Sequence, residues 1–165
     1  MHLLAIDAPS SKGYDLLLLV HVAVALVTMV AVISSSVAAT SLRRAAPSGP
    51  WPPGGARYFA PGRELAGRTL YLIPVTGASL IGISQGAASF GDGFVGIGIV
   101  LWLAIALIAE RFVFAPAARL RRTIASSSVV PVEVGWRHDA ATLTWGVDTI
   151  VALLLVAAVV MVAQP

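Results

Sequence analysis

The chain has 165 residues, of which 58% are hydrophobic and only 12% are charged, and its mean hydropathy is +0.88. Because about 25% of the residues of a soluble domain are charged, this composition excludes an ordinary soluble protein and predicts a single-domain integral membrane protein. Cysteine is absent, which excludes disulfides, thiolate nucleophiles and cysteine-based metal sites.

Four apolar stretches are long enough to cross a membrane, since a hydrocarbon core about 30 Å thick needs roughly 20 residues of helix. The predicted spans are residues 14–42, 69–90, 94–114 and 140–163. We interpret the first span as a retained anchor, because it lacks a basic leader region and is too long for the apolar core of a signal peptide. The predicted fold is an all-α, polytopic four-helix bundle with loops at 43–68 and 115–139.

The basic residues predict the orientation, because Lys and Arg are retained on the cytoplasmic side of a membrane. The loops after the first and third spans are rich in arginine, whereas the opposite side carries only Lys12. We therefore expect both loops in the cytoplasm and both termini outside, in the inner (plasma) membrane of a bacterium. Attraction to anionic lipid headgroups contributes about 1 kcal/mol per basic residue near the surface. The residues assigned to this role are Arg43, Arg44, Arg119, Arg121 and Arg122.

The formal net charge of +3 thus reflects a sided distribution of arginines. We expect no nucleic-acid partner, because the first loop is a Pro/Gly-rich connector and does not interleave basic residues with stacking aromatic ones. The expected partners are membrane lipids and other integral membrane subunits.

Small and polar residues mark the faces on which the first two spans are expected to pack. In the first span they recur at helical spacing as His21, Ala25, Thr28, Val32, Ser35 and Ala39. In the second span the corresponding small-xxx-small series is Ala78, Gly82 and Gly86, with Gln85 beside it. Residues of this kind let helix backbones approach closely inside a membrane, so the two faces predict compact helix packing.

An acidic residue, Asp148, interrupts the fourth span about two turns from its start. An ionisable residue inside a span costs several kcal/mol unless it is paired or hydrated. Glu110 and Arg111 lie at a matching depth near the end of the third span, so we predict an intramembrane ion pair between Asp148 and Arg111, with Glu110 sharing the arginine or reaching the interface. The alternative is that Asp148 carries a proton or a cation.

A single histidine, His21, lies inside the first span at the depth of Gln85, and we predict a buried hydrogen bond between them. The alternative is a haem or copper ligand, for which His2 and Met161 lie on the same side of the membrane. A membrane haem usually takes two facing axial ligands, which the chain does not offer. We therefore expect no cofactor and no metal site.

No hydrolase triad, phosphate-binding loop or zinc-binding helix is present, so no enzymatic activity is expected. The arrangement resembles a family of small bacterial membrane proteins with four predicted spans, described as a domain of unknown function. The resemblance rests on LLVHVAVAL in the first span, GRTLYLIPVTGASLI in the second, FAPAARLRR after the third and the ending MVAQP. A more distant likeness to copper-resistance and cytochrome-b-like four-helix proteins rests mainly on His21, and this chain departs from them by lacking their further intramembrane histidines.

The function predicted from these features is that of a non-catalytic accessory or assembly subunit, which packs against a larger respiratory or transport complex. Two alternatives remain open from the sequence. One is a haem- or copper-binding membrane protein that uses His21, and the other is a small proton-coupled transporter that uses Asp148.

Overall fold

The computed structural model describes residues 12–60, 68–84, 88–132 and 134–163. The helices are α1 (Lys12–Arg43), α2 (Pro53–Tyr58), the 3-10 helix η1 (Thr69–Tyr71), α4 (Leu72–Ile83), α5 (Gly93–Ile108), the π-helix η2 (Ala109–Phe114), α6 (Ala115–Ser126) and α7 (Gly135–Ala163). The prediction of an all-helical membrane protein is therefore confirmed.

Three helices of the described part of the chain are long and apolar enough to cross a membrane: Lys12–Arg43, Gly93–Ser126 and Gly135–Ala163. The predicted second span is represented by the shorter helix Thr69–Ile83. The third span also differs from its prediction, because helix continues through the expected loop as far as Ser126.

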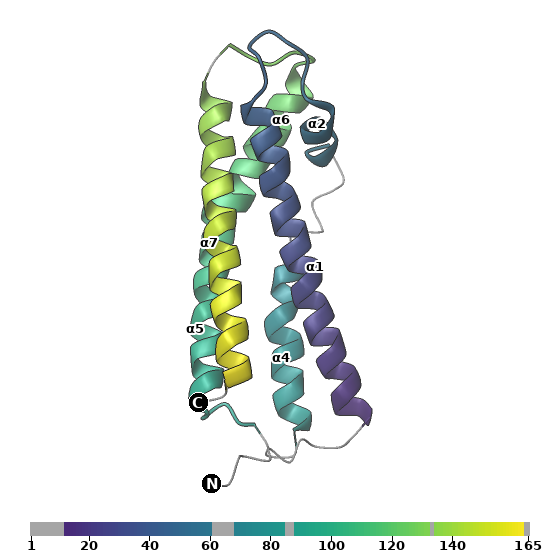
Figure 1. Cartoon of the computed structure of the whole chain (residues 1–165), viewed down its shortest axis with the longest axis vertical. Coiled ribbons are helices and arrows are strands. Elements are labelled where there is room, and N and C mark those ends of the chain that lie inside the picture. Colours follow the sequence, from purple (N-terminus) through teal and green to yellow (C-terminus); the bar gives the residue numbers. More distant parts are fainter. Residues whose placement is uncertain (1–11, 61–67, 85–87, 133, 164–165) are drawn as a thin grey trace.

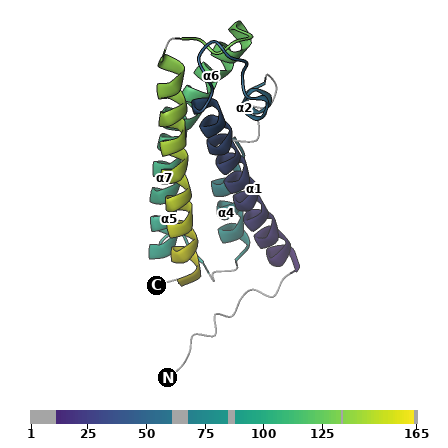
Figure 2. The same cartoon turned by 45° about the horizontal axis from the view of Figure 1, so that its top comes forward.

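Helix α7 is the centre of the arrangement, since it packs against α1 on one side and against α5, η2 and α6 on the other. Helix α4 packs against α1 (Figures 1 and 2). The first turn of α1 and the last turn of α7 lie at one end of the molecule, and α2 and α6 lie at the other. We call the end with α2 and α6 the arginine-rich end.

The inner face of α1 is the one predicted from its small and polar residues. The buried residues of this helix are Thr28, Val32, Ser35, Ala38, Ala39 and Leu42. They recur every three or four positions, which places them on one side of a helix with 3.6 residues per turn.

A proline explains the π-helical turn in the middle of the third long helix. Pro116 has no backbone N–H, and in a regular α-helix its ring would collide with the carbonyl four residues earlier, that of Phe112. The chain widens into a π-helix over Ala109–Phe114 directly before this proline. The Phe112 carbonyl then lies against α7 at Gly146, where an added Cβ would be only 3.0 Å from the carbonyl oxygen. The absence of a side chain at Gly146 is what permits this approach.

The described part of the first connector, residues 44–60, covers the arginine-rich end. Trp51 packs edge-on against Trp136 with ring centroids 5.4 Å apart, and its indole N–H donates to the Ser127 carbonyl at 2.9 Å. The Tyr58 hydroxyl donates to the Ala31 carbonyl of α1 at 2.9 Å. The Trp51–Ser127 bond joins the described parts of the two connectors, and the Tyr58 bond holds the first of them to α1.

Exposed large apolar side chains form a band around the long helices. The band extends over Leu16 to Val37 on α1, Leu72 to Ile83 on α4, Ile97 to Phe112 on α5 and η2, and Trp145 to Val162 on α7. On α1 this distance is about 32 Å at 1.5 Å per residue, close to the thickness of a hydrocarbon core. By contrast, residues 38–43, 115–126 and 135–144 expose no large apolar side chain. We call the exposed large apolar side chains on α1, α4, α5, η2 and α7 the apolar band.

Candidate functional site

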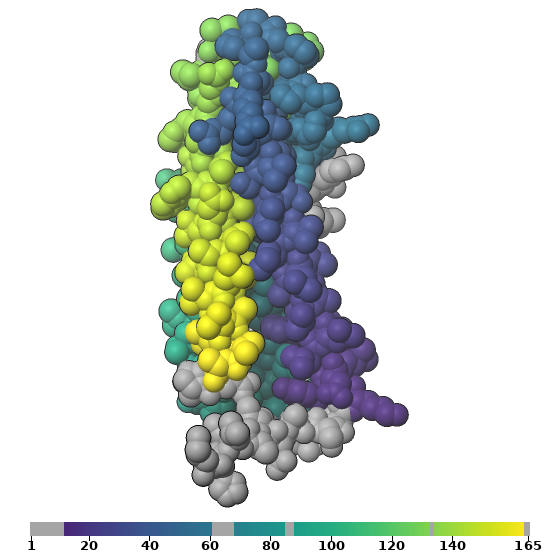
Figure 3. Space-filling view, in the orientation of Figure 1, coloured from purple at the N-terminus to yellow at the C-terminus, as the bar shows by residue number. Residues whose placement is uncertain are grey.

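The most unusual polar group of the membrane-spanning region is Asp148, which lies in an open groove between α1 and α7. The groove has a volume of about 340 Å³. Its lining residues are Ile33, Ser36, Val37, Val147, Asp148, Val151, Ala152 and Leu155. Figure 3 shows the two helices side by side on one face of the molecule. The groove is therefore apolar except for one carboxylate and one hydroxyl, and we call it the Asp148 groove.

The predicted ion pair between Asp148 and Arg111 is not formed. Within residues 12–60, 68–84, 88–132 and 134–163 the structure has one ion pair, Arg119–Asp139, and Asp148 has neither a hydrogen bond nor an ion pair there. The reason is the rotation of α7. Gly146 faces η2, and two residues later the helix has turned by about 200°, so that Asp148 points away from η2 and towards α1.

The depth of Asp148 in the membrane-spanning region also differs from the sequence prediction. Trp145 marks the upper limit of the apolar band on α7, and Asp148 follows it by less than one turn. The apolar residues before Trp145, such as Ala140 and Leu143, are fully buried against other helices and do not face lipid. Asp148 therefore lies at the edge of the band, where a carboxylate is close to water and its desolvation cost is small.

Glu110 and Arg111 are both exposed, and they point in different directions. The Tyr71 hydroxyl donates a hydrogen bond of 2.5 Å to the Glu110 carboxylate, which links η2 to η1. The Tyr71 ring packs edge-on against Trp102 at 6.4 Å between centroids. Glu110 thus has a partner that the sequence analysis missed. Arg111, like Asp148, has no hydrogen bond or ion pair among the described residues.

His21 has a hydroxyl partner on α4. Its Nδ1 lies 2.7 Å from the Thr76 hydroxyl, and a Cβ added at Gly77 would lie 3.4 Å from the His21 Cε1. The predicted partner Gln85 lies outside the described residues, as does His2. One heptad along α1, the Thr28 hydroxyl lies 2.9 Å from that of Thr69. Two polar pairs therefore hold α1 to α4 and its leading turn.

These polar pairs fix the rotation of α4, and they turn the predicted small-residue face away from α1. Thr76 faces α1, so Ala78, two residues further, lies about 200° around the helix. Ala78 and Gly82 are exposed, and an added Cβ on Gly82 would meet no atom within 4 Å. Gly86 lies outside the described residues. Ala78 and Gly82 thus form an outward ridge and do not mediate packing among the residues that the structure describes.

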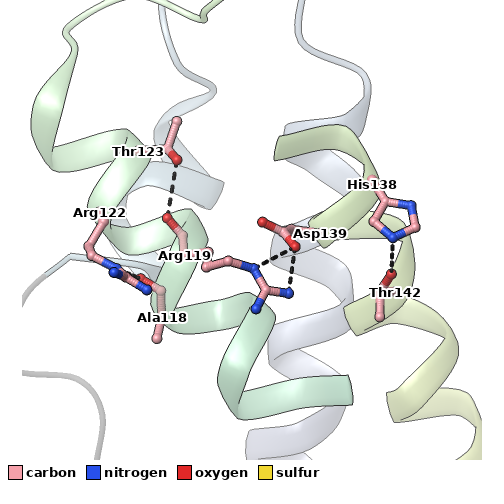
Figure 4. A network of polar contacts seen from close by, with 7 residues as sticks. All are labelled: Ala118, Arg119, Arg122, Thr123, His138, Asp139 and Thr142. Carbon is pink, nitrogen blue, oxygen red and sulfur yellow. Dashed lines mark hydrogen bonds and ion pairs between the residues drawn. The ribbon is translucent and has the colours of Figure 1, made fainter. Parts of the chain in front are cut away.

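At the arginine-rich end Arg119 is bound to Asp139 of α7 (Figure 4). The guanidinium Nε and Nη2 lie 2.8 and 2.7 Å from one carboxylate oxygen, and this partner raises the pKa of Arg119. Arg122 donates from Nε to the Ala118 carbonyl at 3.3 Å and is otherwise exposed. Arg43 and Arg44 are exposed, whereas Arg121 is half-buried. Four of the five predicted headgroup-binding arginines therefore lie at the surface.

Among the described residues, no three His, Asp or Glu side chains are grouped so that they could hold a metal ion. The haem or copper hypothesis for His21 stays a prediction.

The fold and the groove define an all-helical membrane protein with a carboxylate at the edge of its apolar band that is unpaired among the described residues. No family model matches the chain, and no curated protein or solved structure matches it. The resemblance to a four-span bacterial family therefore also stays a prediction.

Proposed function

We propose that this chain is a non-catalytic assembly subunit of a bacterial inner-membrane complex, and that its open side is the flank of α4. The observation that carries the proposal is the incomplete burial of this helix. Helix α4 has no buried residue, although its Thr76 forms the hydrogen bond with His21 that holds it to α1. A helix enclosed in a four-helix bundle buries a continuous stripe of side chains. The exposed flank of α4 thus has room for a helix of another subunit.

The chemistry of this flank fits a helix partner. Ala78 and Gly82 are four residues apart and both are exposed, so they form one side of a helical turn without large side chains. Within lipid, helices associate through close backbone approach and van der Waals packing, which small residues favour. The same ridge in a helix that faced only lipid would gain nothing from being small.

The proposal places the arginine-rich end in the cytoplasm and both chain termini outside. The arginines at this end include Arg43, Arg44, Arg119 and Arg122, and retention of basic residues on the cytoplasmic side supports this orientation. Because the chain has no cysteine, single cysteine variants label cleanly. We expect Lys12→Cys to react with a membrane-impermeant maleimide on intact cells, and His138→Cys to react only in inverted vesicles. The reverse pattern would contradict the orientation.

The assembly role is tested by native purification in a mild detergent. We expect the tagged chain to co-purify with a membrane partner in a fixed ratio, and Gly82→Leu to remove that partner. Gly96→Leu is the matched control, because Gly96 is also an exposed helical glycine with no atom within 4 Å of its Cβ position. Loss of the partner with both variants, or with neither, would argue against docking at α4.

A further inference from the structure

Two opposite charges at the edge of the apolar band have no partner among the described residues. Asp148 and Arg111 are exposed, and neither has a hydrogen bond or ion pair within the parts of the chain that the structure describes. Both would gain from a partner of opposite sign, because an ion pair is stronger at the membrane interface than in bulk water. Arg111 is positively charged and Asp148 is negatively charged, so each could serve as the ion-pair partner of the other.

The two charges lie at the same depth. Phe112 of η2 is opposite Gly146 of α7, since an added Cβ on Gly146 would be 2.8 Å from that of Phe112. The two helices run in opposite directions (Figure 1). Arg111 precedes Phe112 by one residue and Asp148 follows Gly146 by two, so both are displaced towards the same end of the molecule. At 1.5 Å per residue their depths differ by about 1.5 Å.

The two charges nevertheless lie on different faces, so they cannot pair within one chain. Ala109 and Val113, two residues before and after Arg111, are buried at 2% and 4% exposure, which places Arg111 on the outer side of η2. Asp148 lines the groove between α1 and α7. An arginine of one copy can therefore reach the aspartate of another copy that has the same orientation in the membrane.

The surfaces beside the two charges are complementary in shape. Leu107, Leu103 and Val100 continue from Arg111 along one side of α5, at 72%, 54% and 65% exposure, and form a protruding apolar ridge. Val151 and Leu155 continue from Asp148 along the apolar floor of the groove, towards the same end of the molecule. Each surface thus has a charge at the band edge and apolar contacts below it, one convex and one concave.

We propose that a second copy of this chain occupies the Asp148 groove, with the α5 ridge of one copy inserted between α1 and α7 of the next and Arg111 paired with Asp148 across the contact. The contact is head-to-tail: each copy presents a ridge to one neighbour and a groove to the other. Such contacts build a ring or an open row in the plane of the membrane. This self-association uses surfaces other than the flank of α4, so it is independent of the proposed assembly role.

The experiment measures oligomeric state in lipid nanodiscs. It uses the fact that a head-to-tail contact takes Arg111 from one copy and Asp148 from the other. We expect the wild type to form dimers or larger species, and Arg111→Ala and Asp148→Ala each to be monomeric. The two variants are then co-expressed with different tags. Arg111→Ala keeps the Asp148 groove intact, and Asp148→Ala keeps the arginine beside the ridge. The mixture should therefore form a one-to-one dimer and nothing larger. The double variant Arg111→Ala/Asp148→Ala, which lacks both charges, should not associate with itself.

The outcomes separate the proposal from its alternatives. A monomeric wild type would overturn it, and so would single variants that self-associate as the wild type does. Because both side chains are exposed, the variants should keep the helical circular dichroism spectrum of the wild type, which excludes misfolding as a cause. Disulfide formation gives a second measurement. Leu107→Cys in one copy should cross-link to Val151→Cys in another, whereas cross-linking of Val151→Cys to itself would indicate a symmetric contact and overturn the head-to-tail arrangement.

Discussion

Replacing Gly146 by alanine tests the close approach of η2 to α7. The new Cβ would lie 2.8 Å from the Phe112 Cβ and 3.0 Å from the Phe112 carbonyl oxygen. Carbon atoms in favourable contact are about 3.5–4.0 Å apart, so the helices would have to separate by roughly 0.7–1.2 Å. The Phe112 atoms belong to the backbone and to Cβ, so no change of side-chain rotamer can relieve the overlap.

The expected net effect is a loss of stability. Overpacking a well-packed site costs about 1–3 kcal/mol, and rigid backbone atoms place this site in the upper part of that range. Exchange of glycine for alanine inside a helix returns about 1 kcal/mol. The net destabilisation is therefore about 1–2 kcal/mol, which corresponds to a decrease in Tm of about 2–8 °C for a chain of this size.

The assay is thermal unfolding in detergent, followed by circular dichroism or by fluorescence. Gly96→Ala is the matched control, because its new Cβ meets no atom within 4 Å and only the gain in helix propensity remains. We expect Gly96→Ala to unfold at the same temperature as the wild type or higher. A Gly146→Ala variant as stable as the Gly96→Ala variant would refute the close approach and the account of the π-helix that rests on it.

Further predictions concern the polar pairs, the first connector and the apolar band. Thr76→Val keeps the shape of the side chain but removes the hydroxyl that contacts His21, and we expect a loss of about 0.6–1 kcal/mol on unfolding in detergent; an unchanged variant would contradict a stabilising bond. Trp51→Phe removes the N–H bound to the Ser127 carbonyl, so it should lower the free energy of unfolding by about 1 kcal/mol and speed tryptic cleavage at Arg57. Unchanged cleavage would show that the position of the first connector does not depend on this bond. His138→Cys and Val156→Cys are both exposed on α7, so a maleimide should label only the first if the apolar band faces lipid, and equal labelling would contradict this placement.

The overall class of the fold and the inner face of α1 could be predicted from the sequence, because both depend on local patterns. Apolar length predicts membrane helices, and the spacing of Thr28, Val32 and Ser35 places them on one side of α1 whatever that side contacts. The neighbours of each helix are a different matter. Hydropathy does not distinguish Leu143 and Val147 from Leu155, because all three are apolar. In the structure the first two are buried by other helices and the third is exposed.

The partner of Asp148 could not be predicted for the same reason. Matching depth is visible in a sequence, and the depths of Asp148 and Arg111 do agree. The rotation of each helix about its axis is not visible, and here it is set by distant contacts: Gly146 against Phe112 for α7, and His21 with Thr76 for α4. A rotation of about 200° over two residues suffices to place a side chain on the opposite face of its helix.

The polar pairs between α1 and α4 also bear on how the molecule assembles. The most extensive neighbour of α1 is α7, the helix at the opposite end of the chain, so α1 enters the membrane long before its main partner is synthesised. During that interval α4 is the available neighbour, and the hydroxyl pair of Thr28 with Thr69 and the pair of His21 with Thr76 can already form. These bonds set the register of α1 against α4 and its leading turn without any contribution from α5 or α7.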